Sequence, residues 1–584
     1  METSLREADS LLAIDVGDFT TRAVLFDAVE GKYRFLAIGT SPTTVGAPYQ
    51  DIREGVGLAL ERLEEVTGRR LISDENRLII PEQADGSGID TVTATLSAGA
   101  PLRIVIMGLL EEVSVESARN LAATTYAQIV DVISMNDRRS PESRLDALLS
   151  ARPDVIILTG GIEGGASHSI LQFVETVRLA CRLIPNEQRP VVLYAGNQNL
   201  VEEVRKVLGN LTDVRITANI RPGLEMESLE PARVMLSNIY RAIRMRQLGG
   251  VTELDAWTVN RLSPTSTAFG RVIRFLSKVY DPAKGVLGIK VGASATTVAA
   301  AFTGDLSLRV YPQLGLGTGL PGLLQSSQIK NIAGWLPSEV SEDYIRDYIY
   351  NKTIYPASLP GTAEDLAIEQ ALARQVIRTA VALSSSGFPK QAGRSAGGTL
   401  PWFEPVLASG SVISNAPSPA HSMLILLDAL QPTGVTTMVL DQSDLTGLLG
   451  SAANLNPILV VQVLESNAYL SLGTVISPVA EVRPGTPVLR LRVIYDSGDE
   501  TRLEVKQGTL ESVPLPMGQS AQLHLQPLHR ADVGMGGPGI GGNVRVMGGA
   551  LGVVIDARGR PLRLPADPGR RREMFKRWNW ILGG

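Results

Sequence analysis

Residues 11–22 read LLAIDVGDFTTR, and this stretch decides the fold of the chain. The apolar run over 11–16 predicts a buried strand, and residues 22–26 alternate as a second strand does. The segment 17–21 between them predicts a tight turn. A third strand follows over 33–38 and a helix over 51–67, at helical spacing of apolar residues. The chain is therefore expected to open with three strands in hairpin order followed by a helix.

The turn after the first strand carries residue types that suit phosphate. A tight turn between two strands directs backbone N–H groups into a concavity that can hold phosphate oxygens. Gly17 allows the backbone to approach closely, and Thr20 and Thr21 can donate hydroxyl hydrogen bonds. Asp15 can hold Mg²⁺ through water. An Asp-x-Gly turn is as often a plain hairpin, so this stretch alone leaves both interpretations open.

The same unit occurs a second time. Residues 286–291 and 296–302 predict two strands, and Gly292, Ala293 and Ser294 form the turn between them, directly after Lys290. Two such turns would clamp a triphosphate from opposite sides. A third element is Gly410 with Ser411, where a strand ends before a helix that starts near residue 417. Small residues there would let an adenine ring lie against the backbone.

The remaining segments indicate the domain organisation. Strands over 104–107, 129–133, 155–158, 191–194 and 214–217 alternate with helices such as 115–128, 169–183 and 200–208. This rhythm predicts a parallel sheet covered on both faces over about 103–220. Short alternating strands and many glycines after residue 477 predict a small β-barrel or sandwich. We therefore expect a first lobe over 1–265, a second over 266–476, and a C-terminal β-domain over 477–584 that ends in an amphipathic helix.

Length and composition exclude several classes of protein. The chain of 584 residues is too long for one compact core, and 44% apolar with 20% charged residues is typical of a globular protein. A net charge of −5 argues against nucleic-acid binding. Cys181 is the single cysteine, so no intramolecular disulfide forms. No stretch offers the roughly 20 apolar residues of a membrane span, and charges interrupt the N-terminal residues, so we expect a cytoplasmic protein.

Together the three turn segments resemble the superfamily of actin-like ATPases, sugar kinases and heat-shock chaperones. A narrower match lies in SAGAPLR (97–103), GL (108–109), SAR (117–119), DVIILTGGIEGG (154–165), AGN (195–197) and LEPAR (229–233). With these segments, residues 11–478 are similar to the glutamate mutase L family, whose members are regarded as ATP-dependent reactivating or repair partners of cobalamin-dependent mutases. The resemblance implies an α/β, two-lobed actin-like ATPase fold of duplicated ribonuclease H-like units, with ATP or ADP and Mg²⁺ in its cleft.

The chain departs from the family pattern at both phosphate loops. The family has a carboxylate where this chain has Lys290 and usually another at Thr297; it has Ser or Thr in place of Asp18 and Thr in place of Phe19. Acids at these loops help to hold Mg²⁺ and to orient the attacking water, and metal clamping dominates phosphoryl transfer. Lys290 would instead bind phosphate as a point charge. We therefore expect nucleotide binding with slow or absent hydrolysis, while two plain turns in an empty cleft are the alternative.

Two functions remain open for such a chain. The first is a pseudo-ATPase chaperone or reactivating factor, in which the nucleotide changes lobe closure and hence the affinity for a protein partner of the mutase type. The second is a non-catalytic actin-like scaffold whose β-domain supplies a docking surface. A sugar or acyl kinase is weaker, because no catalytic base accompanies the loops, and we assign no catalytic residue. The residues expected to line the cleft are Asp15, Gly17, Thr20, Thr21, Lys290, Gly292, Ser294, Gly410 and Ser411, with Asp15 also as the metal ligand.

Cobalamin itself is not expected on this chain. Modules that bind cobalamin through a βα repeat carry an Asp-x-His-x-x-Gly signature, and the residues around His168 (ASHSI) lack it. The partner, not this chain, would therefore hold the cofactor.

Two further segments have open interpretations. The loop GGIEGG (160–165) precedes a helix that starts near Ser167, and such a loop is either an anion site at a helix N-terminus or a tight βα connection. The C-terminal residues 570–582 place Met574, Phe575, Trp578 and Ile581 at helical spacing beside basic residues. This helix would dock on a partner, lie on a membrane surface or pack on the β-domain.

Overall fold

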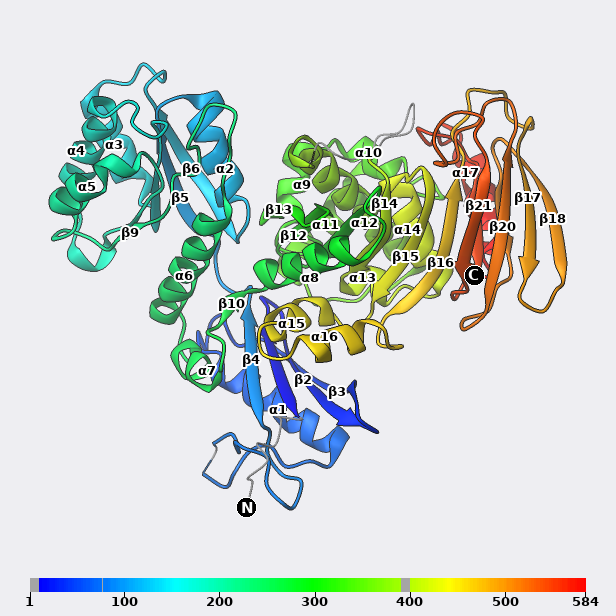
Figure 1. Cartoon of the computed structure of the whole chain (residues 1–584), viewed down its shortest axis with the longest axis horizontal. Helices are drawn as coiled ribbons and strands as arrows, with labels where there is room; N and C mark the ends of the chain where they lie inside the picture. The colour runs from blue at the N-terminus through cyan, green and yellow to red at the C-terminus, as the bar shows by residue number, and fades with distance from the viewer. Residues whose placement is uncertain (1–9, 76, 390–399) are drawn as a thin grey trace. The chain divides into compact units, whose positions relative to one another are not determined.

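The computed structural model describes residues 10–75, 77–389 and 400–584 (Figure 1). The chain divides into two compact units. One contains Leu11–Val24 and Gly39–Thr267, and the other contains Leu25–Ile38 and Ala268–Gly584 together with Ser10. Among the described residues, none of the helices is both long and apolar enough to cross a membrane.

The first sheet is formed by the opening hairpin strands and two later ones. Its order is β10-β4-β1-β2-β3. The strands are β1 (Leu11–Val16), β2 (Thr20–Val29), β3 (Lys32–Pro42), β4 (Thr91–Leu96) and β10 (Ser263–Pro264), and helix α1 covers Arg53–Thr67. β1 pairs in parallel with β4, so that Asp15 lies opposite Thr95. β1 is buried along its whole length, as its continuous apolar run predicts.

The second sheet repeats this arrangement and extends it. Its order is β13-β12-β11-β14-β15-β16-β22-β19. The strands are β11 (Gly285–Val291), β12 (Thr296–Phe302), β13 (Asp305–Tyr311), β14 (Phe403–Ser409), β15 (Gly434–Asp441), β16 (Leu470–Ser477), β19 (Leu510–Val513) and β22 (Val553–Asp556). Here β11 pairs antiparallel with β12 and in parallel with β14, as β1 does with β4. The repeated order of the first five strands confirms the duplicated, actin-like α/β fold.

A parallel βα module lies within the first unit (Figure 1, cyan). Its sheet has the order β6-β5-β7-β8-β9, with β5 (Leu102–Gly108), β6 (Ala127–Ser134), β7 (Val155–Leu158), β8 (Val191–Tyr194) and β9 (Val214–Ile216). The helices are α2 (Glu116–Ala122), α3 (Pro141–Ala151), α4 (His168–Leu183) and α5 (Val201–Leu208), and the long α6 spans Glu230–Gln247. All five expected strands are present. The helix expected over 115–128 ends at Ala122 instead, because the β-branched Thr124 and Thr125 lead directly into β6.

The C-terminal strands are added to the second sheet and also stack against it. β17 (Pro487–Tyr495), β18 (Glu500–Lys506), β20 (Ser520–Pro527) and β21 (Gly542–Met547) form an antiparallel sheet of order β18-β17-β20-β21. Its apolar face shares one buried cluster with residues of β16, β19 and β22. β22 pairs in parallel with β16 and so belongs to the second sheet. Its side chains also pack against the antiparallel sheet of β17, β18, β20 and β21.

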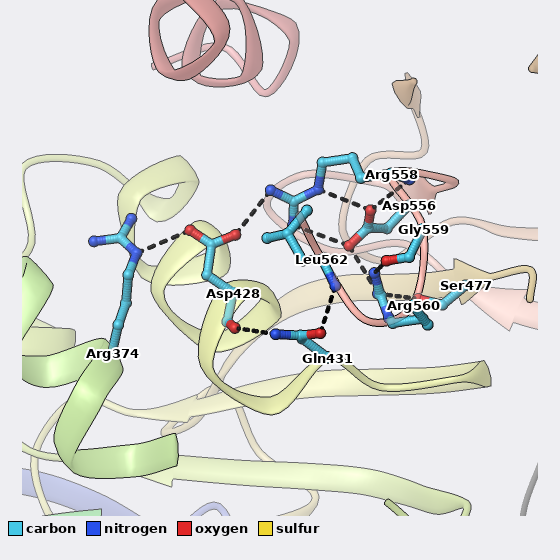
Figure 2. Close-up of polar contacts among 9 residues, drawn as sticks. All are labelled: Arg374, Asp428, Gln431, Ser477, Asp556, Arg558, Gly559, Arg560 and Leu562. Atoms are coloured by element: carbon cyan, nitrogen blue, oxygen red, sulfur yellow. Dashed lines mark hydrogen bonds and ion pairs between the residues drawn. The ribbon is translucent and has the colours of Figure 1, made fainter. Parts of the chain in front are cut away.

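A buried ion network fastens the segment after β22 to two helices of the second unit (Figure 2). Asp428 on α14 (Pro419–Leu430) accepts from Arg374 on α12 (Ala363–Ser384) and from Arg558, each at 2.8 Å. Asp556 accepts from Arg558 at 2.8 Å and from Arg560 at 2.9 Å. Burial alone would raise the pKa of Asp556, but the charges of Arg558 and Arg560 outweigh it and hold that pKa well below its ordinary value. The network joins three guanidinium groups through two carboxylates.

The C-terminal helix α17 (Pro568–Ile581) packs over this network. Trp578 is 3% exposed, and the Arg558 guanidinium lies 4.3 Å from the centroid of its indole ring. Arg374 lies 5.7 Å from the ring of Phe575. Trp578 belongs to the same core cluster as the buried residues of α12 and α14. The helix therefore packs on α14 and also on β19, a strand of the C-terminal segment. The expectation that it packs on the C-terminal β-strands is confirmed for β19, and the contact with the helical layer of the second sheet was not predicted.

Candidate functional site

The first turn holds Asp15 in a nest of hydroxyl donors. Asp15 is 2% exposed, and its Oδ1 accepts from Thr95 Oγ1 at 2.6 Å and from Thr265 Oγ1 at 2.8 Å. Its Oδ2 lies 3.7 Å from Arg22 Nη1. In the turn itself the Gly17 N–H donates to the carbonyl of Thr20 at 3.0 Å. The carboxylate is thus fixed in direction by groups from β2, β4 and the segment that follows β10.

This environment limits how Asp15 can serve a metal ion. Two hydroxyls already use Oδ1, and within residues 10–75, 77–389 and 400–584 no three His, Cys, Asp or Glu side chains gather as a metal site would require. Mg²⁺ in nucleotide sites commonly keeps several waters and uses one or two protein carboxylates plus phosphate oxygens. In such a site Asp15 could hold a water of the ion rather than the ion itself.

The neighbouring polar residues of the turn have separate tasks. The Thr21 side chain is buried, and its hydroxyl donates to that of Thr43 at 3.5 Å. Asp18 accepts from the Gly99 N–H at 2.8 Å. Asp18 therefore anchors the loop that follows β4, which is one of the segments that carried the family resemblance. Thr20 remains half-exposed at the start of β2.

The second turn has the same backbone. The Gly292 N–H donates to the carbonyl of Ala295 at 2.9 Å, as Gly17 does to Thr20. A Cβ on Gly292 would lie 3.1 Å from that carbonyl oxygen, and one on Gly17 would lie 3.0 Å from its own, so both positions favour glycine for the same reason. Lys290 lies opposite Ser409 in the β11–β14 pairing, as Asp15 lies opposite Thr95. Lys290 is therefore the positional counterpart of Asp15.

The charge at the second turn is reversed, and a carboxylate is supplied from elsewhere. Lys290 Nζ donates to Asp444 Oδ2 at 2.7 Å, and Ser409 Oγ donates to Asp444 Oδ1 at 2.9 Å. Asp444 precedes α15 (Leu445–Ala452) directly and adopts φ +60°. The side chains of Lys290 and Asp444 are 14% and 12% exposed. The acid that the family resemblance leads us to expect on β11 is thus replaced by a lysine paired with an acid after β15.

Asp441, at the end of β15, adds a second carboxylate to this region. It accepts from the N–H groups of Leu445 and Thr446, both at 2.8 Å, and from the Thr446 hydroxyl at 2.6 Å. Burial and, next, the charge of Asp444 raise its pKa, although these hydrogen bonds oppose the rise. Sequence reasoning missed both acids. The sequence does contain a signal, Asp441-x-x-Asp444, between an apolar strand and an apolar helix. Side chains at the carboxyl end of such a strand commonly contribute to ligand-binding sites in α/β sheets.

The structure brings the remaining predicted residues of the second unit to the Lys290 turn. Gly410 has φ +128°, and a Cβ there would lie 2.2 Å from the carbonyl oxygen of Val291, so only glycine allows the end of β14 to approach β11 this closely. Ser411 is exposed at the start of the short α13 (Ser411–Ser414), and Ser294 lies in the turn itself. The glycine-rich loop that follows β13 also reaches the turn, since Leu316 N–H donates to the Gly292 carbonyl at 2.9 Å.

The predicted site residues thus fall into two groups. Asp15, Gly17, Thr20 and Thr21 surround the first turn in one unit, and Lys290, Gly292, Ser294, Gly410 and Ser411 surround the second turn in the other. The residues that prediction missed are Thr95, Thr265, Ser409, Asp441 and Asp444.

Comparison with known proteins places the chain in a family. Residues 11–468 match the family described as MutL protein. Protein MutL of Clostridium tetanomorphum is 24% identical over 305 residues, which are 51% of this chain and 59% of that protein, so less than two thirds of that relative is covered.

Similar solved structures are more distant. They include the diol dehydratase-reactivating factor in its nucleotide-free form, which is 12% identical and covers 77% of this chain and 100% of its own, with a TM-score of 0.30.

 The ethanolamine utilization protein EutJ of Carboxydothermus hydrogenoformans is 9% identical and covers 77% of this chain and 93% of its own, with a TM-score of 0.28. Component A of the (R)-2-hydroxyglutaryl-CoA dehydratase of Acidaminococcus fermentans is 10% identical and covers 76% and 97%, with a TM-score of 0.25. The family match, in contrast, extends over well more than half of the chain and confirms the resemblance to glutamate mutase L: the chain belongs to the MutL protein family.

Proposed function

We propose that the protein binds ATP or ADP with Mg²⁺ through the Asp15 turn and the Lys290 turn, hydrolyses ATP slowly or not at all, and uses the bound nucleotide to change its affinity for a protein partner. The observation that carries this proposal is the repetition of one glycine turn, with hydrogen bonds of 3.0 and 2.9 Å at matching positions. A tight turn between two strands can present its remaining backbone N–H groups to phosphate oxygens.

The role proposed for Lys290 follows from its chemistry. An ammonium group binds phosphate as a point charge with three rotatable donors. In the structure this group donates to Asp444, so phosphate binding requires Lys290 to exchange, or to share, that carboxylate. Asp444 would then hold Lys290 in position between nucleotide-binding events.

The proposal of slow hydrolysis rests on the distribution of acids. Phosphoryl transfer depends mainly on metal clamping and on neutralisation of charge at the transferred group. The first turn carries two carboxylates, and both have hydrogen-bond partners: Asp15 accepts from Thr95 and Thr265, and Asp18 accepts from the Gly99 N–H. At the second turn a cation stands in the position of the expected acid. This arrangement favours binding over the positioning of a metal-activated water.

The proposed partner is a protein, of the kind that the family resemblance implies: a cobalamin-dependent mutase. A nucleotide can change affinity for that partner only if it binds two conformations of this chain unequally. A second function, a scaffold that binds no nucleotide, is favoured by one observation. The Lys290–Asp444 pair satisfies the charge of the turn internally, as a plain structural turn would.

Thermal unfolding with and without ATP and Mg²⁺ separates the two functions. A ligand at about 100 times its Kd stabilises the folded state by about 2.7 kcal/mol, which raises Tm by several degrees. We expect this rise in the wild-type protein and its loss in Lys290→Ala. The matched control is Lys284→Ala, which removes the ammonium that pairs with Glu404 near the other end of β11 and should leave the ATP effect intact. Absence of any rise in the wild type would favour the scaffold.

A further inference from the structure

We propose that the carboxyl edge of the βα module is a docking surface for a protein partner that presents apolar side chains flanked by lysine or arginine. The proposal deepens the proposed function, since it rests on the expectation of a protein partner. It does not depend on nucleotide binding.

The topology of the module identifies this edge as a place for binding. The sheet order is β6-β5-β7-β8-β9, so the chain runs from β5 to β6 on one side and then places β7 on the other side of β5. All neighbouring pairs are parallel. In open parallel sheets the loops at the carboxyl ends, and above all those beside such a reversal of order, form the binding region. Here these are the loops after β5 and β7.

Large apolar side chains are exposed at this edge. Leu110, after β5, is 46% exposed, and Ile162, after β7, is 40% exposed. Leu224 and Met226, in the turn after β9, are 58% and 60% exposed. Contiguous exposed apolar groups mark interaction sites more often than isolated ones do. Methionine adapts its shape to different partners.

Hydrogen bonds show that these loops are neighbours. The Glu163 N–H donates to the carbonyl of Pro222 at 3.2 Å, which joins the β7 loop to the β9 loop. A Cβ on Gly160 would lie 2.7 Å from Leu109 Cγ, which places the β5 loop against the β7 loop. Arg221 donates to the carbonyl of Leu224 at 2.6 Å. The side chains of Leu110, Ile162, Leu224 and Met226, called here the edge patch, are therefore carried by adjoining loops.

The loop after β7 is held in place by hydrogen bonds with two asparagine side chains. Asn197 accepts from the Gly164 N–H at 3.4 Å and donates to the Gly165 carbonyl at 3.3 Å. Asn219 donates to the Gly161 carbonyl at 2.9 Å. These internal bonds favour the tight βα connection over the anion site that the glycine pattern left open. The loop thus acts as a fixed support for Ile162, which lowers the entropic penalty of binding.

The charge around the edge patch selects the partner. Six exposed glutamates lie in the loops and helix start that surround it: Glu111, Glu112, Glu116, Glu163, Glu225 and Glu227. Asp137 and four arginines, Arg119, Arg138, Arg139 and Arg221, lie in the same region, so that the carboxylates exceed the guanidinium groups by three, seven to four. Arg119 is also 3.6 Å from Glu111. An acidic rim of this kind attracts basic groups and repels anionic lipid headgroups, which favours a basic protein segment over a membrane.

The test uses the full-length chain and two amphipathic peptides, one of Leu and Lys and one of Leu and Glu. We expect the Leu/Lys peptide to bind, with an affinity that falls as salt is added, and the Leu/Glu peptide not to bind. Hydrogen–deuterium exchange should show protection of 159–166 and 219–228 in the complex. Leu224→Ser with Met226→Ser should weaken binding at least about tenfold, as expected for the loss of two anchor side chains.

Two further variants keep the test decisive. Glu112→Lys with Glu225→Lys changes only exposed rim charges and should also weaken binding and reduce its salt dependence. The matched control is Val66→Ser, which removes an equally exposed aliphatic side chain on α1 and should change nothing. Equal peptide affinity in wild type and variants would overturn the proposal. So would self-association, or binding to zwitterionic vesicles, that Leu224→Ser with Met226→Ser abolishes, because the occupant would then be a second copy or a lipid surface.

The nucleotide measurement stays separate from this test. Peptide binding without any effect of ATP on Tm would sustain the docking surface while the proposed nucleotide function fails. An effect of ATP with no peptide protection at the edge would do the reverse.

Discussion

The Asp15 turn and the Lys290 turn have one backbone and opposite charges. Each places a glycine N–H on the carbonyl three residues later, and each lies between the first two strands of a repeated sheet. At the first turn, however, Asp15 accepts hydrogen bonds from two threonine hydroxyls. At the second turn, Lys290 donates a hydrogen bond to Asp444. The glycine and the strand pairing are therefore common to both turns, while the charge of the residue two positions before the glycine differs.

The two regions also differ in what is attached to them. The first unit contains a βα module with a sheet of its own, and the second contains C-terminal strands that join its central sheet. The buried ion network fastens this second attachment.

The largest effect is expected from Asp428→Ala. Asp428 is fully buried and accepts from both Arg374 and Arg558, so its loss leaves two buried cations without this carboxylate. Removal of one partner from a buried ion pair costs about 3–5 kcal/mol. Urea unfolding should show that loss, and hydrogen exchange should locate it in the second unit.

The control for this variant is Asp213→Ala. The Asp213–Arg215 pair is about half-exposed, and such pairs contribute less than about 1 kcal/mol. An Asp428→Ala protein as stable as the Asp213→Ala protein would show that the network does not fasten the C-terminal strands.

The second prediction restores the acid that the family resemblance implies at position 290. In Lys290→Asp combined with Asp444→Asn, a carboxylate returns to the β11 position while like-charge repulsion with residue 444 is avoided. We expect ATP hydrolysis at saturating Mg²⁺ to rise at least about tenfold, which is about 1.4 kcal/mol in the barrier. Asp444→Asn alone is the control and should not produce the rise. An unchanged rate in the double variant would mean that the charge at position 290 does not limit hydrolysis.

The third prediction concerns what the two turns share. A Cβ would lie 3.0 Å from a carbonyl oxygen at Gly17 and 3.1 Å at Gly292. Gly17→Ala and Gly292→Ala should therefore lower the free energy of unfolding by similar amounts, about 1 kcal/mol each. Gly57→Ala on α1, where a Cβ meets open space, is the control and should not destabilise the protein. A large difference between the two turn variants would contradict their equivalence.

The smallest effect is expected in how the free energy of unfolding depends on pH, through Asp441 near the Lys290 turn. The pKa of Asp441 is raised above its ordinary value of 3.8 by burial and by the charge of Asp444. Its charged form is thus disfavoured in the folded state, so the wild type loses stability as pH rises from about 3.8 through the raised pKa. Relative to the wild type, Asp441→Asn should gain stability over that range in urea titrations at successive pH values. A difference that stays constant with pH would show that Asp441 has an ordinary pKa.

The periodicity of the sequence predicted most of the strands. It did not predict which side chains from other segments contact the two turns. The hairpin strands and the five strands of the βα module were predicted, because continuous apolar runs bounded by turn residues carry a strong local signal. Thr95, Thr265 and Asp444 were not. They reach the turns through parallel pairing with strands far away in the chain, and a single sequence does not reveal which of its polar residues meet there.

The C-terminal helix is a second case in which the sequence did not reveal all of the long-range contacts. Its amphipathic pattern was evident from the spacing of Phe575 and Trp578, but its binding surface was predicted only in part: the contact with β19 was expected, and the contact with α14 was not. The docking of Trp578 depends on Arg558, whose position is set by the two buried carboxylates Asp428 and Asp556. Local periodicity therefore predicts that a face is apolar, and long-range ion pairs decide what that face contacts.

Calorimetric titration of ATP into wild type and Lys290→Ala, each with Mg²⁺ and with EDTA, tests most directly whether Lys290 replaces part of the metal's charge. We expect the wild type to bind ATP with Mg²⁺ and to retain measurable binding in EDTA, because the ammonium still neutralises the phosphates. Lys290→Ala should bind at least about tenfold more weakly with Mg²⁺ and not at all in EDTA. Equal affinities of the two proteins in both buffers, or no ATP binding by the wild type, would contradict the account.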